Sequence, residues 1–401
     1  MSQIDFFRSF DSDYLSRLPN ENLYHILEQL DDEDQQYLSW TCKWLYRLVR
    51  MNRFGVVSPI WEDAKITNSE ILSASCYRDA VVINNILYIP DLMKEKPYCY
   101  SINFVQHPLK LIKHPIELDY NTKNHYEPCE FIATAAIDNR LYIFGGKNLN
   151  TGEITNNFYE LNIITFELKK IENCHHLPKA RMMHTLNSID HHRLALFGGR
   201  WCMNGKFYDS REFAIYDTRK NSWTFHNETT FFPSQRSNHS TMFVNGKFYV
   251  YGGQQLTSSS KLNRIHDDPD IWEYDVLKLN WRKYLNGWSL SKLLLPNNCI
   301  STSGKYPSKR CGAAMFPIRK HIAILGGNEM QNNEEHRSWE YMKILSPTKH
   351  TWVHVRIQGM PQIECVSIFT NYKVDTKNIF ILGKDQKEGK IVMGWIKDKQ
   401  T

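Results

Sequence analysis

Short runs of apolar residues recur along the chain, and four of these runs consist of four apolar residues followed by a pair of glycines. They are LYIFGG at 141–146, LALFGG at 194–199, FYVYGG at 248–253 and IAILGG at 322–327. Successive side chains of a strand point to opposite faces, so a short run that is apolar throughout is typical of a β-strand that packs on both faces. Glycine at a strand end permits positive φ and close approach of a neighbouring backbone. The pattern predicts a strand-rich repeat.

The spacing of the glycine pairs predicts the size of one repeat. Between the second glycines of successive pairs, the steps are 53 residues (146 to 199), 54 (199 to 253) and 74 (253 to 327). A period of about 50 residues is expected for one four-stranded propeller blade. The longer third step predicts an insertion, which we place at 285–307. The Asn245-Gly246 turn between two alternating runs predicts a hairpin.

Two further motifs run in phase with the glycines. After each glycine pair, two residues stand seven positions apart, aromatic in three copies: Tyr159 and Phe166, Tyr216 and Trp223, Tyr274 and Trp281, and Leu345 and Trp352 in the fourth. An arginine follows proline by three positions at Arg181, Arg236 and Arg310. Three phased motifs predict that one supersecondary unit is repeated.

These repeats resemble kelch repeats, whose blades form β-propellers. The likeness is specific over roughly residues 127–358, and weaker copies flank it at 81–103 and 372–385, which implies a mainly β fold with a six-bladed propeller. Trp61 precedes Leu87 by 26 residues, a spacing close to that of fourth-strand aromatics in other copies. We therefore expect a strand near Trp61 to close the last blade and remove its open edge. The alternative is a tryptophan in a linker.

The first fifty residues follow a helical pattern instead. Leu23, Ile26, Leu27 and Leu30 stand at i, i+3, i+4 and i+7, which is typical of an amphipathic helix. Helices this short bury little core alone, so we expect their apolar side to contact a partner or, alternatively, the propeller. The segment resembles an F-box. The resemblance divides the chain into a three-helix F-box domain at 1–52 and a kelch propeller at 53–401.

The F-box pattern is matched at most of its positions. They are Leu18, Pro19, Glu21, Leu23, Ile26, Leu27, Leu30, Asp34, Leu38, Cys42 and Lys43, with departures at Asn22 and Leu45. An F-box followed by a kelch propeller is similar to the substrate receptors of SCF-type (cullin-RING) E3 ubiquitin ligases. The resemblance implies that a Skp-type adaptor, itself bound to a cullin, contacts Leu18, Pro19, Glu21, Leu23, Ile26, Leu27, Leu30, Leu38, Cys42 and Leu45. It also implies that the propeller binds the protein to be ubiquitinated, and that the receptor is no enzyme and needs no cofactor.

The strand order predicts which face of the propeller binds that protein. Antiparallel strands place the loops after the glycine pairs and the links between blades on one face. The residues predicted to bind substrate there are Lys147, Arg181, Arg200, Trp201, Arg236, Gln254, Arg310 and Asn328. Arginines suit carboxylate or phosphate groups, so we expect an acidic or phosphorylated segment. Alternatively, the repeated arginines bond loop carbonyls within their own blades.

Composition and charge narrow the class of protein. The 401 residues, 42% hydrophobic and 23% charged, are ordinary for a globular chain. Nine cysteines without a CxxC pair indicate free thiols in a reducing compartment, the cytoplasm or nucleus. Residues 1–50 hold nine acids and five bases, a balance of −4, against +10 for the remainder. An acidic head on a basic body suggests two units with different partners.

Other functions remain as alternatives. Neighbouring histidines, at 175–176 and 191–192, point to opposite faces of a strand and chelate poorly, so we expect no metal. We also expect no nucleic-acid partner. We expect no membrane partner, since no apolar run is long enough to span a bilayer. A kelch scaffold outside any ligase and a metal-dependent kelch enzyme are the two alternative functions.

Overall fold

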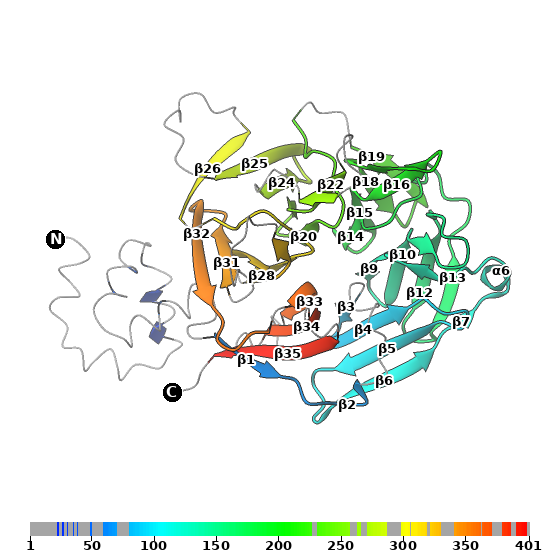
Figure 1. Ribbon diagram of the computed structural model, residues 1–401, viewed down its shortest axis with the longest axis horizontal. Helices are drawn as coiled ribbons and strands as arrows, with labels where there is room; N and C mark the ends of the chain where they lie inside the picture. The colour runs from blue at the N-terminus through cyan, green and yellow to red at the C-terminus, as the bar shows by residue number, and fades with distance from the viewer. Residues whose placement is uncertain are drawn as a thin grey trace.

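The computed structural model describes most of the chain beyond residue 58 and a few residues before it. The described ranges are 59–69, 80–226, 231–256, 263–265, 271–286, 298–304, 306–318, 321–329, 341–361, 363–370, 379–385 and 390–398, with Asn22, Leu23, Ile26, Leu27, Leu30, Gln35, Leu38 and Val49. These ranges are mainly β, and Figure 1 shows the sheets arranged around a common centre in a propeller-like way. The apolar runs and the glycine spacing predicted this arrangement. No helix within these ranges is long and apolar enough to cross a membrane.

Antiparallel meanders of strands that follow one another in the chain make up the sheets. One sheet consists of β14 (Thr185–Ser188), β15 (Arg193–Phe197), β18 (Phe213–Asp217) and β19 (Ser222–Phe225). A second consists of β3 (Val81–Ile83), β4 (Ile86–Asp91), β5 (Tyr98–Asn103), β6 (Leu109–Pro115) and β2 (Ile66–Thr67). A third consists of β9 (Ala133–Ile137), β10 (Arg140–Phe144), β12 (Phe158–Asn162), β13 (Glu167–Lys170) and β7 (Glu117–Leu118). The short helix α6 (Tyr120–Lys123) follows β7, capped by Asp119.

A nine-stranded sheet contains two further meanders. The first is β20 (Ser240–Val244), β21 (Lys247–Tyr251), β24 (Ile271–Asp275) and β25 (Asn280–Asn286). The second is β28 (Ala314–Ile318), β29 (His321–Leu325), β31 (Tyr341–Ser346) and β32 (Thr351–Arg356). They are joined by β26 (Cys299–Gly304), which pairs in parallel with both β25 and β32. This joining strand lies within the insertion predicted at 285–307.

The last sheet combines strands from both ends of the propeller. It consists of β33 (Ile363–Thr370), β34 (Ile379–Asp385), β35 (Ile391–Asp398) and β1 (Pro59–Asp63). Trp61 of β1 lies opposite Ile396 in antiparallel register. Its indole packs against Gly394, where an added Cβ would clash with the ring. The edge of β35 is therefore paired rather than open, and the spacing of Trp61 in the sequence indicates the same strand.

The first strand of each meander forms the inner wall of the ring. The contacts between neighbouring sheets follow the order β3, β9, β14, β20, β28 and β33. Each glycine pair directly follows the second strand of its sheet. The ring is thus built from repeats whose glycine loops occupy equivalent places.

Aromatic side chains fill the space between neighbouring sheets. Trp223 lies opposite Tyr216, and its ring centroid is 5.5 Å from that of Phe144 in the preceding sheet. Trp281 repeats this arrangement opposite Tyr274, 6.0 Å from Phe197. Such pairs bury large areas and favour edge-to-face geometry, so they form the core between blades.

The first repeat departs from the predicted aromatic pair. Leu161 lies opposite Leu168 there, in the places that Tyr216 and Trp223 take in the next sheet. Phe166 instead lies in the turn before β13, with φ of 55°, and stacks on His114 at 4.1 Å. Tyr159 and Phe166 are therefore not the counterparts of Tyr216 and Trp223, although the sequence motif grouped the two pairs together. Leucines occupy the core positions of this repeat. A motif defined by aromatic residues therefore falls two residues too early in the sequence.

Candidate functional site

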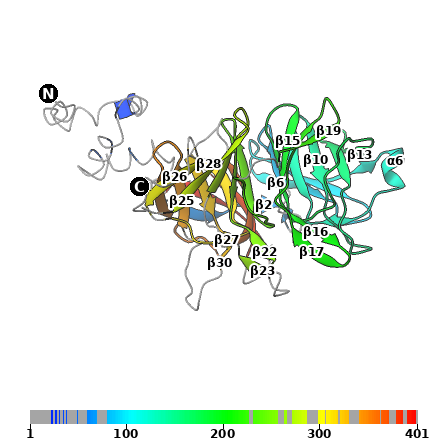
Figure 2. The same ribbon diagram turned by 90° about the horizontal axis from the view of Figure 1, so that it is seen from above.

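Each loop after a glycine pair forms a small two-stranded sheet, either by folding back on itself or by pairing with the link that precedes its own sheet. These are β8 (Cys129–Glu130) with β11 (Lys147–Asn148), β16 (Arg200–Met203) with β17 (Lys206–Asp209), β22 (Gln254–Leu256) with β23 (Asn263–Ile265), and β27 (Arg310–Cys311) with β30 (Asn328–Glu329). Figure 2 shows β16, β17, β22, β23, β27 and β30 along one side of the ring. We call this side the glycine-loop face. The residues predicted to bind substrate lie on or beneath it.

Three repeated arginines connect neighbouring sheets beneath this face. Arg181, Arg236 and Arg310 are 1%, 0% and 1% exposed. Their backbone carbonyls accept hydrogen bonds from the preceding glycine loop: Gly146 N to Arg181 O at 2.8 Å, Gly199 N to Arg236 O at 2.9 Å, and Gly253 N to Arg310 O at 2.9 Å. Their Nη1 atoms donate to the next glycine loop: to Gly198 O at 3.0 Å, Gly252 O at 3.0 Å and Gly326 O at 2.8 Å, respectively. Each arginine thus joins two sheets.

Burial of these arginines corrects the expectation that they contact substrate. Arg236 also donates from Nε to Ser234 O at 3.1 Å and from Nη2 to Ser234 Oγ at 3.2 Å. Arg181 forms a hydrogen-bonded ion pair with Glu212. Burial lowers the pKa of Arg181, and the neighbouring Glu212 carboxylate opposes that shift. A guanidinium group held by loop carbonyls is structural, which is the alternative that the sequence left open.

Glycine is required in these loops because an arginine carbonyl comes too close for a side chain. At Gly198, with φ of 64°, an added Cβ would lie 2.7 Å from Arg236 O. The first glycine of the next pair, Gly252, meets Arg310 O in the same way. Only glycine combines positive φ with such close approach at little steric cost. The glycine and arginine motifs are therefore two halves of one structural contact.

Arg200 is buried rather than exposed, which corrects a second expectation. Its side chain is 7% exposed and its Nε lies 2.9 Å from Asp209 Oδ1, directly across the β16–β17 pair. Its Nη2 donates to Ser237 Oγ at 3.1 Å. Asp209 Oδ2 in turn accepts from Leu256 N at 2.6 Å. Asp209 therefore neutralises the charge of Arg200 within the hairpin. The bonds to Ser237 and Leu256 connect the Arg200–Asp209 pair to the next repeat.

The remaining predicted substrate residues differ in exposure. Lys147 has a 39% exposed side chain and lies 3.4 Å from Glu130 Oε1. Gln254 is 9% exposed within β22. Trp201 and Asn328 are half-buried. The structure therefore brings Lys147, Trp201 and Asn328 to the glycine-loop face with part of each side chain accessible.

Sequence reasoning missed a group of exposed apolar side chains on the β16–β17 hairpin. Met203, Phe207 and Tyr208 are 49%, 50% and 38% exposed. Trp201 stacks on Tyr208 with ring centroids 5.0 Å apart and an interplanar angle of 30°. The available signal was Asn204-Gly205, a strong hairpin dipeptide between two short runs rich in large apolar residues. These side chains change the character of the face from basic to mixed aromatic and basic.

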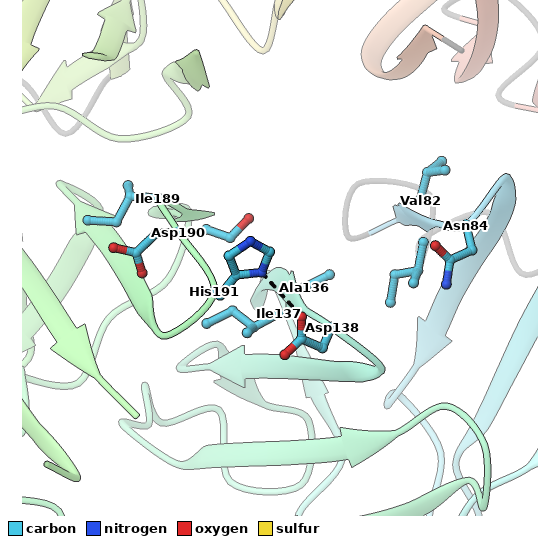
Figure 3. A pocket seen from close by; sticks show the side chains of 10 residues that line it. Val82, Asn84, Ala136, Ile137, Asp138, Ile189, Asp190 and His191 are labelled. Carbon is cyan, nitrogen blue, oxygen red and sulfur yellow. Dashed lines mark hydrogen bonds and ion pairs between the residues drawn. The ribbon is translucent and has the colours of Figure 1, made fainter. Parts of the chain in front are cut away.

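A pocket of about 400 Å³ opens on the opposite face, where turns between first and second strands converge. Figure 3 shows Val82 and Asn84 on one side of it and Asp190 and His191 on the other. Asp190 Oδ1 accepts from the backbone nitrogens of His192 and Arg193 at 2.9 and 2.7 Å, so its carboxylate organises the turn. Throughout the described part of the chain, no group of three or more potential metal-ligating side chains is present.

Two buried histidines follow the arginine motif. His184 and His239 are 5% and 6% exposed. The His184 ring meets Phe144 edge-on, with centroids 5.5 Å apart. Burial lowers the pKa of His184 well below its ordinary value, and the charges of Arg181 and His239 lower it further. His184 is therefore neutral in the folded protein at physiological pH.

Stability is expected to depend on His184 at acidic pH. Its depressed pKa means that the unfolded state takes up the proton first. The stability that this histidine contributes is therefore complete above about pH 6.5 and falls as the pH drops below that value. In urea unfolding, His184→Gln is expected to make the free energy of unfolding less dependent on acidic pH, by up to about 1.4 kcal/mol per pH unit. The control is His191→Gln, whose side chain is 93% exposed. Equal pH profiles of the two variants would exclude this role.

The N-terminal residues predicted to bind an adaptor fall into two groups. Leu18, Pro19, Glu21, Cys42 and Leu45 lie outside the described residues. Leu23 and Leu27, each 3% exposed, form an apolar cluster with Val49, and Leu30 and Leu38 pack against it.

The apolar cluster places two of the predicted contacts inside the N-terminal segment. Gln35 Nε2 donates to Leu27 O at 2.5 Å and to Leu30 O at 3.1 Å. Leu23 and Leu27 thus pack within this segment, and their expected contact with an adaptor stays a prediction. Ile26 is half-buried in a helix and retains accessible surface.

Comparison with known proteins places the chain among kelch proteins. It is 27% identical over 199 residues to kelch domain-containing protein 3 of Homo sapiens, covering 48% of this chain and 46% of the relative. It is 23% identical over 212 residues to N-(sulfonatooxy)prop-2-enimidothioate sulfolyase of Thlaspi arvense, covering 50% of this chain and 56% of that protein. The chain therefore spans about half the length of these curated relatives.

A further relative and a family model complete the comparison. The chain is 27% identical over 173 residues to Rho GTPase-activating protein gacHH of Dictyostelium discoideum, covering 42% of this chain and 10% of that protein. The sequence model of the KLHDC2/KLHL20/DRC7 Kelch-repeats domain matches residues 132–383. That range contains all four glycine pairs and the three buried arginines. The chain belongs to this family of kelch-repeat proteins.

Proposed function

We propose that the chain is the substrate-recognition subunit of an SCF-type (cullin-RING) E3 ubiquitin ligase. In this proposal the N-terminal segment binds a Skp-type adaptor and, through it, a cullin, and the kelch propeller binds the protein to be ubiquitinated. The receptor has no catalytic role of its own. It acts in the cytoplasm or nucleus by raising the effective concentration of substrate lysines near the conjugating enzyme.

The observation that carries the proposal is an F-box-like pattern placed ahead of a kelch propeller. Kelch-repeat proteins mediate protein–protein interaction, and the family model matches residues 132–383, which form most of the propeller. The helical state of Leu23, Ile26 and Leu27 and their cluster with Val49 agree with a small helical unit at the N-terminus. Half-buried Ile26 supplies apolar surface of the kind that an adaptor would cover.

A finer architecture forms part of the same proposal. Residues 1–52 form a three-helix F-box, and residues 53–401 form a propeller of six blades. The sheets described above supply six meanders, and the pairing of β1 with β35 gives the last of them its fourth strand. Full closure removes exposed sheet edges that would otherwise promote aggregation.

Replacement of Ile26 by glutamate is expected to abolish adaptor binding while leaving the propeller folded. A carboxylate at an apolar contact cannot be desolvated cheaply, so the loss is about 2 kcal/mol or more in binding free energy. The measurement is affinity purification of the full chain from cells, with adaptor and cullin quantified by mass spectrometry.

Asn22→Ala is the matched control because Asn22 is exposed and also helical. It is expected to retain both partners. Thermal unfolding of the propeller is expected to be the same for wild type and both variants. Equal recovery of the adaptor with wild type and Ile26→Glu would argue against the F-box assignment. Recovery of neither partner with wild type would favour the alternative of a kelch scaffold outside a ligase.

A further inference from the structure

One face of the β16–β17 hairpin presents aromatic and apolar side chains together with lysines. Residues directly opposite each other are Trp201 and Tyr208, and Met203 and Lys206. Side chains alternate along a strand, so these four residues share one face of the two-stranded sheet. We call it the hairpin face. The other face carries Phe207 near the turn and the buried Arg200–Asp209 pair at the opposite end of the hairpin.

The hairpin face is exposed and apolar at its centre. Met203 and Tyr208 are 49% and 38% exposed, and Trp201 is half-buried beneath its stack with Tyr208. Stacking fixes the two rings against each other, so a ligand that covers them loses little additional side-chain entropy. Aromatic residues and methionine are enriched at the cores of protein interfaces. This surface therefore has the composition of an interface centre.

Charge at the edge of the hairpin face is positive. Lys179 Nζ lies 4.7 Å from the centroid of the Trp201 ring, and Lys206 is exposed on the same face. The neighbouring carboxylates are engaged internally, Asp209 with Arg200 and Glu212 with Arg181. A ligand approaching this hairpin therefore meets ammonium groups beside an apolar centre. Complementarity of charge favours carboxylates at the rim of the bound segment.

We propose that the hairpin face binds a protein segment in which a large apolar side chain is flanked by aspartate or glutamate. The apolar side chain packs against Met203 and Tyr208, and the carboxylates lie near Lys179 and Lys206. The inference names the class of segment bound and rests on the proposed role of the glycine-loop face as the binding surface. It does not depend on whether the N-terminal segment binds an adaptor.

An anionic membrane would also present negative charge to an apolar surface. Two lysines contribute about 1 kcal/mol each near such a membrane, and stable anchoring usually needs a second signal of larger area. A single hairpin offers little area for insertion. The observations therefore favour a peptide segment over a lipid surface.

The test is selection of a phage-displayed library of random peptides against the purified full chain. Selected peptides are expected to combine Asp or Glu with a large apolar residue and to lose binding when lysine replaces their acids. A Met203→Ser, Tyr208→Ser double variant is expected to bind them at least about tenfold more weakly. Lys206→Glu is expected to weaken binding about threefold, with a smaller dependence on salt than wild type.

Phe207→Ser is the matched control, because Phe207 is 50% exposed on the other face of the same hairpin. It is expected to bind the selected peptides as wild type does. Circular dichroism and melting temperature check that each variant is folded, and Lys206→Glu tests the face even if the double variant misfolds.

Several results would overturn the proposal. Selection of no peptide would contradict binding at this face, and selection of basic peptides only would contradict the predicted charge. Equal binding by the double variant places the site elsewhere. Sedimentation with phosphatidylserine vesicles that is lost in the double variant, without selection of any acidic peptide, would assign the face to a lipid surface. Adaptor binding is measured separately, so failure here leaves the ligase proposal intact and failure of that proposal leaves this one testable.

Discussion

Trp61→Ala in the full chain is expected to lower the free energy of unfolding by about 3 kcal/mol. Trp61 lies opposite Ile396, and its indole covers Gly394, which has no side chain of its own to fill the space. Trp61 is half-buried and packs against the apolar cluster that contains Ile396, so its truncation removes these contacts from the sheet that joins the two ends of the propeller. Because a typical domain is stable by only 5 to 15 kcal/mol, the loss is expected to appear clearly in urea unfolding of the purified protein.

Glu62→Ala is the control for this prediction. Glu62 is the next residue of the same strand and is exposed, and exposed substitutions usually change stability by less than about 0.5 kcal/mol. The two variants therefore separate the contribution of the indole from that of the strand as a whole. Equal unfolding midpoints for Trp61→Ala and Glu62→Ala would contradict the role of β1 in holding the last sheet.

Arg236→Leu is expected to destabilise the protein by about 3 to 5 kcal/mol, because it leaves several buried acceptors without donors. Arg236 is 0% exposed and donates to Gly252 O and to both the carbonyl and the hydroxyl of Ser234. Leucine has a shorter, apolar side chain that can replace none of these bonds. Thermal and urea unfolding of the full chain measure the loss.

Arg219→Leu provides the comparison for Arg236→Leu, since Arg219 has a 67% exposed side chain next to Asp217. It is expected to leave the unfolding curve nearly unchanged. If Arg236→Leu instead unfolds as wild type does but loses a bound protein partner, Arg236 acts in recognition and the structural role assigned here is wrong.

Strand positions and the size of the repeat could be predicted because they depend on local periodicity. The runs that end in Gly146, Gly199, Gly253 and Gly327 are short and apolar throughout, as expected for strands packed on both faces, and their spacing indicates the length of one blade. Trp223 could be predicted because it follows Tyr216 by seven positions, the same spacing that separates Tyr274 from Trp281. The insertion that contains β26 followed from the longer step between two glycine pairs. Each of these signals lies within one repeat.

The roles of the arginines could not be predicted because they depend on contacts between repeats. Nothing in the residues around Arg310 indicates that its guanidinium group reaches Gly326 O while its carbonyl accepts from Gly253 of the preceding loop. Arg200 and Asp209 are nine residues apart, and only the hairpin between them places the charges together. The same motif therefore permits an exposed binding residue or a buried link between sheets.

The hairpin face escaped prediction for a related reason. Met203 and Tyr208 look like core residues in the sequence, since large apolar side chains are usually buried. Their exposure follows from the place of β16 and β17 outside the four-stranded sheet, which a local pattern does not reveal. Leu161 and Leu168 illustrate the converse, because two core positions lack the aromatic residues that mark them elsewhere.

The measurement that tests the central proposal most directly is calorimetric titration of a purified Skp-type adaptor–cullin complex into the purified full chain. The account predicts saturable binding with one adaptor per chain, which Ile26→Glu abolishes and Asn22→Ala preserves. Elution of the mixture as a single complex from a sizing column is expected to agree. Absence of binding heat, with the chain and the adaptor complex eluting separately, would contradict the assignment of this kelch protein to a ubiquitin ligase.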